Sequence, residues 1–580
     1  MSTPPAIIGI WDGHDAGAAL IMGGRVIIAL NEERLTGRKL EIGWPIRSLA
    51  AIRDAAGSEW EHAHFAFTTS DAAKTLTRLW PASREKYYRL RRRLDEPSWT
   101  DGITRRAKYR LTQWPSCSLL VALARGHAAR ALGVSRGRVH VVDHHAAHAA
   151  SAALWPEWRE DALIVTLDGI GDGASGSVWR RNLTDGALTP LLRLPGSASL
   201  GLFFEHITEV LQMRPLEDEG KVMALAAFAA APRDAEDPFA DWFRLHPADQ
   251  DHPLPRITCR ISPVAMRRAV ERVVWRFPRE QVCRAAQGLL ERLIPAFFSA
   301  LSEATGIRAF AYSGGVASNI KVNRLVRLAP GVDRIEICPA MGDGGLALGA
   351  AAFVWQDLSG MPCEPFTDFR LGPDHGALDA GIAGALRAGE TLARPVDIAE
   401  HVAHLVAEGE VVMWAQGRME LGARALGARS IVARADSEAA RDALNLRLKR
   451  RVWYQPFCPS LLETEAPRLL ADYTGTADTN RHMTMGFTTT PEGRKALAGA
   501  IGPDGSCRPQ LVAAHPTDPW ARLLEAVRLR TGTGAVINTS LNVHGKPMPD
   551  TPLGVLEAWR ESGIRHLALG SVCLSREERT

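Results

Sequence analysis

The pattern that most constrains the fold of this chain is a strand-turn-strand unit that occurs twice. Apolar runs at 6–10, 17–22 and 25–31 are separated by glycine-containing turns and predict short antiparallel strands. A second set, at 162–168 and 175–179, repeats the opening: an apolar strand that ends in Asp-Gly, a polar turn and another strand. The repeat predicts a weak internal duplication, with chance similarity of two short units as the alternative.

The bulk composition excludes several classes of protein. A chain of 580 residues is long enough for about two to four domains. The net charge of +4 is small for this length and does not indicate binding to nucleic acid. No apolar run is long enough to span a membrane. The N-terminus enters a strand rather than a secretory signal. Eight cysteines without Cys-x-x-Cys spacing predict reduced thiols and a cytoplasmic protein, not a disulfide framework or a zinc ribbon.

Helical and extended segments alternate along the rest of the chain. Residues 45–135 are predicted to be mostly helical, and the segment 356–395 lacks clear periodicity, so we expect a domain boundary there. A separate α/β unit is predicted to follow from residue 396. The other predicted helices are 200–230, 262–305, 438–450 and 552–562, and the other predicted strands are 309–312, 335–339, 411–414 and 534–537.

Two histidines, His144 and His148, lie in an alanine-rich segment that is predicted to be helical. At this spacing both imidazoles leave the same face of a helix, one turn apart. Two neutral imidazoles that converge on one point are typical ligands of a transition metal. His145 is about 100° round the helix and is not expected to join them. The alternative is that these histidines are half-buried and hydrogen-bonded within the fold.

Asp343 lies in the second of two glycine-rich loops, 313–319 and 342–345, which each follow a predicted strand and precede a helix. Glycine lets the backbone approach a ligand, and a helix N-terminus offers unpaired N–H groups to phosphate. Two such loops with two Asp-Gly turns favour a nucleotide site. Asp343 is the predicted third metal ligand, because two histidines and one aspartate leave positions open for water and a phosphate oxygen. Capping of the next helix is the alternative role.

His14 and Asp15 lie at the first turn of the first strand-turn-strand unit. A His/Asp pair there can accept a proton from a hydroxyl nucleophile. The alternative is that the two side chains hold the turn. The basic segment 84–110 predicts a solvated helix face, with an anionic partner or a subunit contact as further options.

A cluster of cationic and amide side chains occurs in the C-terminal unit. Arginines next to glycine-rich turns suit bidentate capture of phosphate, and Asn and Ser side chains complete an oxyanion site. The pattern predicts an anion site, with ordinary surface arginines as the alternative. The candidates are Arg418, Arg424, Arg429, Ser430, Lys449, Arg451, Arg508, Asn538, Ser540 and Asn542.

Motifs along almost the whole chain match one family in the family's order. The chain resembles the O-carbamoyltransferases of natural-product and nodulation-factor biosynthesis, the NodU/CmcH type. The matching stretches are 14–15 with 31–34, 143–148, 217–223, 313–319 with 339–343, 417–420, 423–427, 455–460 and 538–542.

The resemblance implies an α/β chain with two fused domains. Residues 1–355 would have the duplicated actin-like/sugar-kinase (ASKHA) fold of threonylcarbamoyl transferases, 356–395 would be a linker, and 396–580 would be a YrdC-like α/β domain. The C-terminal domain would form carbamoyl-adenylate from carbamoyl phosphate and ATP. The N-terminal domain would pass the carbamoyl group to a hydroxyl of a small natural-product-like acceptor, giving a carbamate ester.

The resemblance also implies roles for individual residues. His144, His148 and Asp343 would bind a divalent metal, with iron first and zinc, manganese or magnesium as alternatives. His14 would be the base for the attacking hydroxyl, with Asp15 beside it. Asp168, Ser313, Gly314, Gly315 and Asn319 would hold nucleotide, and Arg418, Lys449, Arg508, Asn538 and Ser540 would bind carbamoyl phosphate.

This chain departs from the family pattern at three positions, all in the C-terminal part. Ala423 stands where the family usually has proline. Gln455 stands where an arginine usually precedes the Pro-Phe-Ala-Pro motif, and Cys458 replaces the alanine of that motif. Loss of the arginine would weaken one anion contact, for which Lys449 or Arg451 would compensate.

Two other functions remain open from the sequence. A threonylcarbamoyl-type transferase that modifies tRNA would use the same two folds; the small net charge counts against it and the basic segment 84–110 for it. A non-catalytic nucleotide-sensing module is the other, and the complete His/His/Asp set counts against it. We expect a cytoplasmic enzyme without membrane or nucleic-acid partners, with homo-oligomerisation open. The sequence does not identify the acceptor molecule, although 70–110 and 232–258 are candidate loops for binding it.

Overall fold

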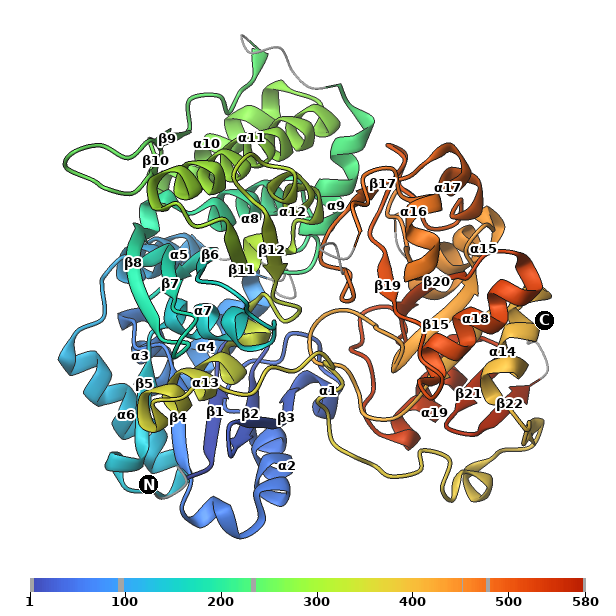
Figure 1. Ribbon diagram of the computed structural model, residues 1–580. Helices are drawn as coiled ribbons and strands as arrows, with labels where there is room; N and C mark the ends of the chain where they lie inside the picture. The colour runs from blue at the N-terminus through green and yellow to red at the C-terminus, as the bar shows by residue number, and fades with distance from the viewer. Residues whose placement is uncertain (1–4, 92–98, 231–235, 451, 476–479, 577–580) are drawn as a thin grey trace. The chain divides into compact units, whose positions relative to one another are not determined.

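The computed structural model describes residues 5–91, 99–230, 236–450, 452–475 and 480–576. The chain forms two compact units (Figure 1): Met1–Ala29 with Ile42–Thr367, and Leu30–Glu41 with Asp368–Thr580. The expected linker, 356–395, contains the point at which the first unit passes into the second. The basic segment 84–110 lies only partly within the described residues, since 92–98 fall outside them.

The first sheet of unit 1 is built from the opening strands. β1 pairs with β2 antiparallel and with β4 in parallel, and β4 pairs with β5 in parallel. The order across the sheet is β3-β2-β1-β4-β5. The strands are β1 (Ile7–Trp11), β2 (Gly17–Met22), β3 (Arg25–Asn31), β4 (His64–Thr68) and β5 (Val139–Val142).

The second sheet repeats this topology. Its order, β12-β11-β6-β7-β8, is an antiparallel meander followed by two parallel strands, as in the first sheet. The predicted duplication is therefore confirmed, and with it the duplicated α/β architecture expected of an actin-like chain. The strands are β6 (Ala162–Gly171), β7 (Ala174–Arg181), β8 (Leu188–Pro195), β11 (Ala309–Ser313) and β12 (Arg334–Ile337).

Helices cover both sheets, and two segments predicted to be continuous helices are each broken. The segment 200–230 is interrupted around Pro215, and α11 begins directly after Pro278, because proline cannot continue the hydrogen-bond ladder of a helix. The helices of unit 1 are α2 (Ile46–Ala56), α3 (Ala72–Leu79), α4 (Pro81–Arg91), α5 (Trp99–Leu111), α6 (Ser118–Leu132), α7 (His144–Leu154), α8 (Leu200–Val210), α9 (Glu219–Leu225), α10 (Pro263–Arg276), α11 (Arg279–Thr305), α12 (Ile320–Arg327) and α13 (Leu346–Ser359).

Helix α13 packs closely against α7 and against β1 (Figure 1). A Cβ added to Gly349 on α13 would lie 1.9 Å from the carbonyl oxygen of Ala147 on α7. A Cβ added to Gly9 on β1 would lie 1.8 Å from the carbonyl oxygen of Ala347 on α13. Both contacts are backbone approaches that a side chain would block, so these glycines set the spacing of the three elements.

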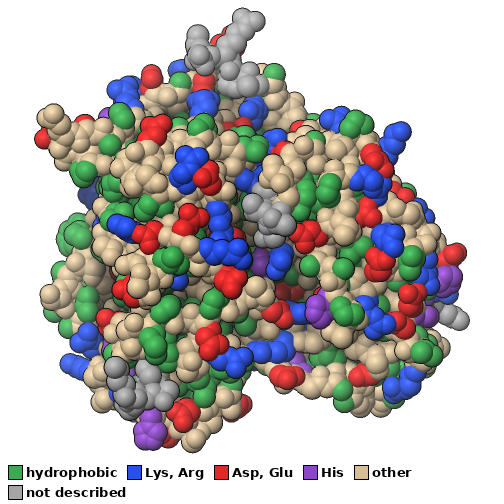
Figure 2. Space-filling view, viewed as in Figure 1, with side chains coloured by type: hydrophobic (Ala, Val, Ile, Leu, Met, Phe, Trp, Pro, Cys, Tyr) green, Lys and Arg blue, Asp and Glu red, His purple; other side chains and the backbone are tan. Residues whose placement is uncertain are grey.

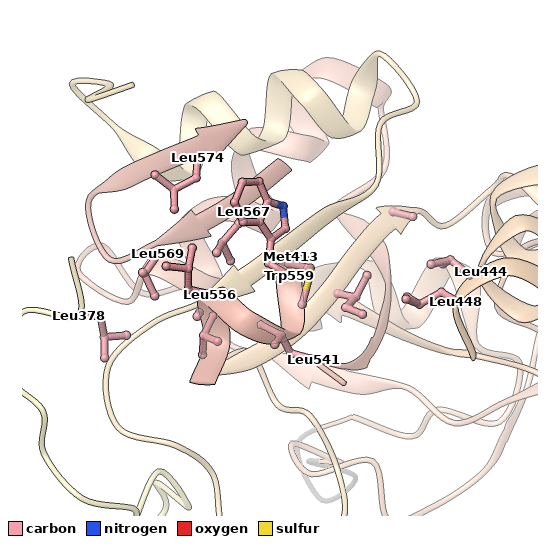
Figure 3. Close-up of a cluster of buried hydrophobic side chains, with 14 of the residues drawn as sticks. Leu378, Met413, Leu444, Leu448, Leu541, Leu556, Trp559, Leu567, Leu569 and Leu574 are labelled. Atoms are coloured by element: carbon pink, nitrogen blue, oxygen red, sulfur yellow. The ribbon is translucent and has the colours of Figure 1, made fainter. Parts of the chain in front are cut away.

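Unit 2 is built on one mixed sheet of eight strands, in the order β13-β22-β21-β14-β15-β20-β16-β19. One face of this sheet packs on a buried cluster that includes Trp559, Met413 and Leu567 (Figure 3). The strands are β13 (Glu390–Ala393), β14 (Val412–Ala415), β15 (Arg429–Arg434), β16 (Cys458–Leu462), β19 (Gln510–Val512), β20 (Ala535–Ser540), β21 (His566–Leu569) and β22 (Val572–Arg576).

The helices of unit 2 lie on both faces of that sheet. The other face packs on α14 and α18, with Trp414 and Trp520 in the shared core. The predicted helix at 438–450 is α-helical at first and continues as a π-helical turn, Leu444–Lys449. The α-helices of unit 2 are α1 (Glu33–Thr36), α14 (Ile398–Ala407), α15 (Glu438–Ala443), α16 (Ala466–Leu469), α17 (Pro491–Ala496), α18 (Pro519–Thr531) and α19 (Pro552–Ser562).

The surface agrees with the small net charge. Acidic and basic side chains are interspersed on the face shown in Figure 2. Among the described residues, no helix is long and apolar enough to cross a bilayer.

We predict that Gly349→Ala destabilises unit 1. The added methyl group would force α13 and α7 apart, and overpacking of this kind costs about 1–3 kcal/mol. Gly220→Ala on α9 is the matched control, because a Cβ there meets no described atom within 4 Å. Differential scanning calorimetry should give a lower Tm for Gly349→Ala and an unchanged or higher Tm for the control. Equal Tm values for Gly349→Ala and the wild type would contradict the packing argument.

Candidate active site

Helix α7 presents two histidines to the interior of unit 1. Asp143 caps the helix by accepting the N–H groups of His145 and Ala146. The N–H of His144 is accepted by the buried Asp172 carboxylate at 2.9 Å. The start of the helix is thus fixed from both sides, and His144 and His148 lie one turn apart with their imidazoles 4.8 Å apart.

Two aspartates complete a buried cluster with these imidazoles. Nε2 of His144 lies 3.0 Å from Oδ2 of Asp168 and 3.7 Å from Oδ1 of Asp343. Nε2 of His148 lies 3.7 Å from the same Asp168 oxygen and 3.6 Å from the same Asp343 oxygen. One ligand atom from each of the four side chains falls within 4.8 Å of all the others. The cluster therefore has the donors and the spacing of a metal site.

The charges of this cluster are strongly coupled. Burial lowers the pKa of His144, but the Asp168 hydrogen bond and the Asp343 charge outweigh burial and raise it to about 9. Burial raises the pKa of Asp343, but the charges of His14 and His144 outweigh burial and bring it to about 2. The carboxylates are therefore ionised, and their negative charge is what draws a cation, or protons in its absence, to the cluster.

Neighbouring side chains orient the two imidazoles. Nδ1 of His144 lies 3.3 Å from the Thr69 hydroxyl, and Nδ1 of His148 lies 3.5 Å from the Ser313 hydroxyl. Nε2 of His148 is buried and has no hydrogen-bond partner among the described residues. Both rings thus turn Nε2 toward the carboxylates, the arrangement in which the second ring nitrogen is held by an outer partner.

His145 faces elsewhere, as its position round the helix predicts. Its ring nitrogens contact the Thr166 hydroxyl at 2.8 Å and the Ala174 carbonyl at 3.1 Å. Burial and the charge of His144 lower its pKa to about 3, so this ring stays neutral. The alternative of a hydrogen-bonded structural histidine therefore applies to His145.

His14 lies beside the cluster. Its Nε2 is 3.2 Å from Oδ2 of Asp343, and its Nδ1 is 3.4 Å from Oδ2 of Asp15. Asp15 has a positive φ of 55°, a backbone conformation that aspartate adopts more readily than most residues. The turn that carries both residues is also held by a 2.7 Å hydrogen bond from Trp11 Nε1 to the His14 carbonyl. The structure therefore brings the predicted base next to the predicted metal ligand Asp343.

The first glycine-rich loop closes against Asp168. The N–H of Gly315 donates to Oδ1 of Asp168 at 2.7 Å. Gly314 has a φ of 93°, and a Cβ there would lie 2.2 Å from the Leu167 carbonyl oxygen. Asn319 caps α12 and exchanges two hydrogen bonds with Gln287. The side chain of Asn319 is therefore engaged within the protein.

Asp168 and Asp343 differ in how well the sequence revealed their positions. Asp343 makes no side-chain capping bond to the 3₁₀ turn η7 (Asp343–Gly345) or to α13, and its carboxylate faces the histidines. Asp168 was expected to hold nucleotide, and the structure places it among the candidate metal ligands. The signal for Asp168 was present in the repeat, because Asp168 and Asp12 each belong to an Asp-Gly pair in one of the two strand-turn-strand motifs.

The predicted anion residues of unit 2 are held by protein groups. Nζ of Lys449 donates to the carbonyl of Ser540 at 2.5 Å and to Oδ1 of Asn542 at 2.7 Å, and it lies 3.4 Å from the Ser540 hydroxyl. Arg508 directs two N–H groups at the Cys458 sulfur, at 2.9 and 3.1 Å. Cys458 lies opposite Asn538 in the sheet. The end of β20 thus gathers four of the five predicted residues.

Arg418, the fifth, donates to the carbonyl oxygens of Leu371 and Gly372 at 3.0 and 2.6 Å. Sequence reasoning gave Arg429 no more weight than its neighbours, yet it is fully buried and donates to four carbonyl oxygens, including that of Asp550. Glu420 is also fully buried and accepts three backbone N–H groups. Burial of an ionisable residue depends on tertiary packing, which motif spacing does not report.

Known proteins match the chain along most of its length. The carbamoyltransferase N-terminus family matches residues 6–352, and the carbamoyltransferase C-terminus family matches residues 403–576. The nodulation protein NolNO of Sinorhizobium fredii is 30% identical over 579 residues, covering 97% of this chain and 79% of that protein. The 3'-hydroxymethylcephem-O-carbamoyltransferase of Amycolatopsis lactamdurans is 28% identical over 369 residues, covering 63% of this chain and 66% of that protein.

Solved structures resemble the chain more distantly. The (R)-2-hydroxyglutaryl-CoA dehydratase component A of Acidaminococcus fermentans is 13% identical with a TM-score of 0.33, covering 61% of this chain and 100% of that one. Because this similarity is low, the description of the fold rests on the strand order of the chain itself. The two family matches together span both units, so the chain belongs to the carbamoyltransferase family of the NodU/CmcH type and is an enzyme that transfers carbamoyl groups.

Proposed function

We propose that this enzyme is an ATP-dependent O-carbamoyltransferase that works in two stages. Unit 2 converts carbamoyl phosphate, ATP and water into carbamoyl-adenylate, phosphate and pyrophosphate. Unit 1 transfers the carbamoyl group to a hydroxyl of a small acceptor. In that step the hydroxyl oxygen bonds to the carbamoyl carbon, the bond from that carbon to the AMP oxygen breaks, and AMP leaves.

One observation carries the proposal for unit 1. The cluster of His144, His148, Asp168 and Asp343 lies directly beside His14, whose Nε2 is 3.2 Å from Asp343. Transfer of a group from an adenylate to a hydroxyl needs a cation site next to a base. The cation would neutralise the charge of the phosphate, and the base would remove the proton of the hydroxyl.

The four side chains fit a divalent metal. The Nε2 atom of His148 is buried without a hydrogen-bond partner among the described residues, and two ionised carboxylates face it. Mixed imidazole and carboxylate donors suit iron, manganese or zinc better than magnesium, which prefers oxygen ligands. A divalent cation held there would supply Lewis-acid stabilisation of the adenylate phosphate.

His14 would take the proton of the attacking hydroxyl. Its imidazole has a carboxylate on either side, Asp15 at Nδ1 and Asp343 at Nε2. These carboxylates would stabilise the imidazolium that forms when the ring accepts a proton. The ring is also partly exposed, with 18% of its side-chain surface accessible, so an acceptor can reach it.

The cationic end of β20 supports adenylate formation in unit 2. Lys449 and Arg508 provide an ammonium and a planar guanidinium for phosphate oxygens, and Ser540 adds a hydroxyl. Both cations contact neutral groups, among them carbonyl oxygens, a hydroxyl, an amide and a thiol. A phosphate anion would compete well with such groups for a cation.

We predict that His148→Ala abolishes metal binding, because it removes one of two imidazole ligands. After dialysis against Fe²⁺, Mn²⁺ or Zn²⁺, plasma mass spectrometry should show metal content lowered about tenfold or more. His145→Gln is the control and should keep its metal, since His145 faces Thr166 and not the cluster. Full metal content in a folded His148→Ala protein would refute the site.

We predict that His14→Gln slows carbamoyl transfer by about 10²–10⁴, the usual contribution of a general base. Pyrophosphate release that depends on carbamoyl phosphate should continue at the wild-type rate, because that stage belongs to unit 2. Transfer is measured by mass spectrometry on a panel of hydroxylated metabolites. The expected gain is about 43 Da, the mass of a carbamoyl group minus that of the hydrogen it replaces. Unchanged transfer in His14→Gln would exclude this residue as the base.

We predict that Arg508→Gln and Ser540→Ala each lower pyrophosphate release that depends on carbamoyl phosphate. Loss of a hydrogen bond to a charged ligand costs about 1.5–3 kcal/mol, which corresponds to about a 10- to 150-fold loss of kcat/KM. Arg468→Gln is the control, since Arg468 pairs with Glu465 and Glu492 elsewhere in unit 2. Equal losses in all three variants would point to folding damage rather than to an anion site.

A further inference from the structure

Thr69 has a backbone conformation that threonine rarely adopts. It follows directly after β4, its φ is 72°, and the residue is 1% exposed. A positive φ crowds the branched Cβ of threonine against its own backbone, so this conformation is strained and persists only where neighbouring groups hold it. Other parts of unit 1 must therefore hold Thr69 in place.

Arg78 on α3 is the first of these groups. Its Nη1 donates to the Thr69 carbonyl at 2.7 Å, and its Nη2 donates to the Thr68 carbonyl at 3.0 Å. The same guanidinium donates to the two carboxylate oxygens of Asp12, at 2.9 and 3.0 Å. The side chains of Arg78 and Asp12 are 2% and 1% exposed, so water does not compete for these bonds. One planar guanidinium thus ties Thr69 to the turn that carries His14.

The same segment is also tied to the start of α7. The N–H of Thr69 donates to the carbonyl of Val142 at 2.9 Å. The Asp172 carboxylate accepts the N–H of Ser70 with one oxygen and the N–H of His144 with the other, both at 2.9 Å. These contacts fix the backbone of Thr69 relative to His144. Its hydroxyl then lies 3.3 Å from Nδ1 of that imidazole.

The direction of the bond between Thr69 and His144 follows from the role of the ring. A metal ligand uses the lone pair of Nε2, so the proton of a neutral His144 ring lies on Nδ1. Nδ1–H then donates to the Thr69 hydroxyl, and Nε2 stays turned toward Asp168 and Asp343. Outer partners of this kind contribute about 10- to 100-fold to metal affinity.

We propose that Arg78 is a positioning residue for the metal site and that it acts through Thr69. By holding the strained backbone of Thr69, it keeps the hydroxyl on His144 and fixes that imidazole relative to the His14 turn. The inference rests on the proposed function. Among the described residues, Arg78 makes no hydrogen bond or ion pair with the four side chains of the cluster, so its effect on a bound cation must pass through the groups that it holds.

The test of Thr69 measures the Mn²⁺ affinity of the full chain from the electron paramagnetic resonance of the free ion. Thiols bind Mn²⁺ poorly, so the free cysteines do not contribute. Thr69→Val keeps the branched shape without the hydroxyl and should weaken Mn²⁺ binding by about 10- to 100-fold. Thr69→Ser keeps the hydroxyl and should restore most of the affinity. Thr69→Gly adopts this φ without strain and should show the same loss as Thr69→Val, which keeps the test decisive if the valine variant does not fold.

The test of Arg78 is a double-mutant cycle. Arg78→Lys keeps the positive charge beside Asp12 but loses the planar fork, and it should weaken Mn²⁺ binding by about tenfold. Combined with Thr69→Val, it should cause no further loss beyond that of Thr69→Val alone, because the hydroxyl through which Arg78 acts is already gone. A merely structural role of Arg78 would give losses that multiply.

Arg138→Lys is the matched control. Like Arg78, Arg138 donates to two carbonyl oxygens, here those of Ala63 at 2.8 Å and Trp60 at 3.0 Å. These residues precede β4, at the end of the strand away from Thr69. This variant should keep the wild-type Mn²⁺ affinity.

Three results would overturn the inference and leave the proposed function standing. They are wild-type affinity in a folded Thr69→Gly protein, wild-type affinity in a folded Arg78→Lys protein, and losses that multiply in the double variant. A wild type that binds no Mn²⁺ would overturn the metal site of the proposed function itself.

Discussion

The candidate site in unit 1 depends on how closely α13 approaches α7 and β1. Its ligands come from segments far apart in the chain: His144 and His148 from α7, Asp168 from β6, and Asp343 from the turn before α13. Gly349 allows α13 to rest on the backbone of Ala147, the residue next to His148. Gly9 allows β1, which leads to His14, to rest on the same helix. The absence of a side chain at Gly9 and at Gly349 thus allows the close approach of the elements that carry His14, the two imidazoles and Asp343.

The two units present opposite charges to their proposed substrates. In unit 1 two buried carboxylates face two imidazoles, and each group is tolerated in the interior because of the others. In unit 2 the end of β20 gathers an ammonium and a guanidinium, and both contact neutral groups there. Negative charge suits a cation site, and positive charge suits a phosphate. This division agrees with an enzyme that activates a carbamoyl group in one unit and transfers it in the other.

Sequence reasoning was accurate where the signal was local. The spacing of His144 and His148, the turn after β1, and the strands β2 and β3 all follow from short-range geometry and were predicted correctly. The turn expected at Asp168-Gly169 was wrong, because β6 continues through these residues to Gly171. β4 and β5 were not. β4 is a short strand inside the stretch 45–135 that was predicted to be mostly helical, β5 lies just after that stretch, and the pairs β1–β4 and β4–β5 are long-range contacts. Proline chemistry alone does not predict where 262–305 breaks, because the helix is interrupted at Pro278 but continues through Pro295.

Roles within the site were harder to assign than positions. Asp168 accepts the Gly315 N–H with one oxygen and faces the imidazoles with the other, so it touches both the glycine-rich loop and the candidate metal-ligand cluster. The resemblance pointed to the first contact and not to the second. Glu420 stands in a matching motif, 417–420, that assigned it no role, and Gln510 stands in none of the motifs. The contacts of both depend on which way a buried carboxylate or amide is turned. Such orientation emerges only when every donor and acceptor around it is known.

The division of the chain has a consequence for how the protein can be made. Leu30–Glu41 belongs to unit 2, although unit 1 surrounds it in the sequence, and Arg34 donates to the Gly422 carbonyl at 2.7 Å. On the ribosome, this early segment must wait for several hundred residues to emerge before its partners exist. A gene fragment that starts at residue 368 would lack it, so the two halves of the polypeptide are not interchangeable modules that evolution or an engineer can simply cut apart.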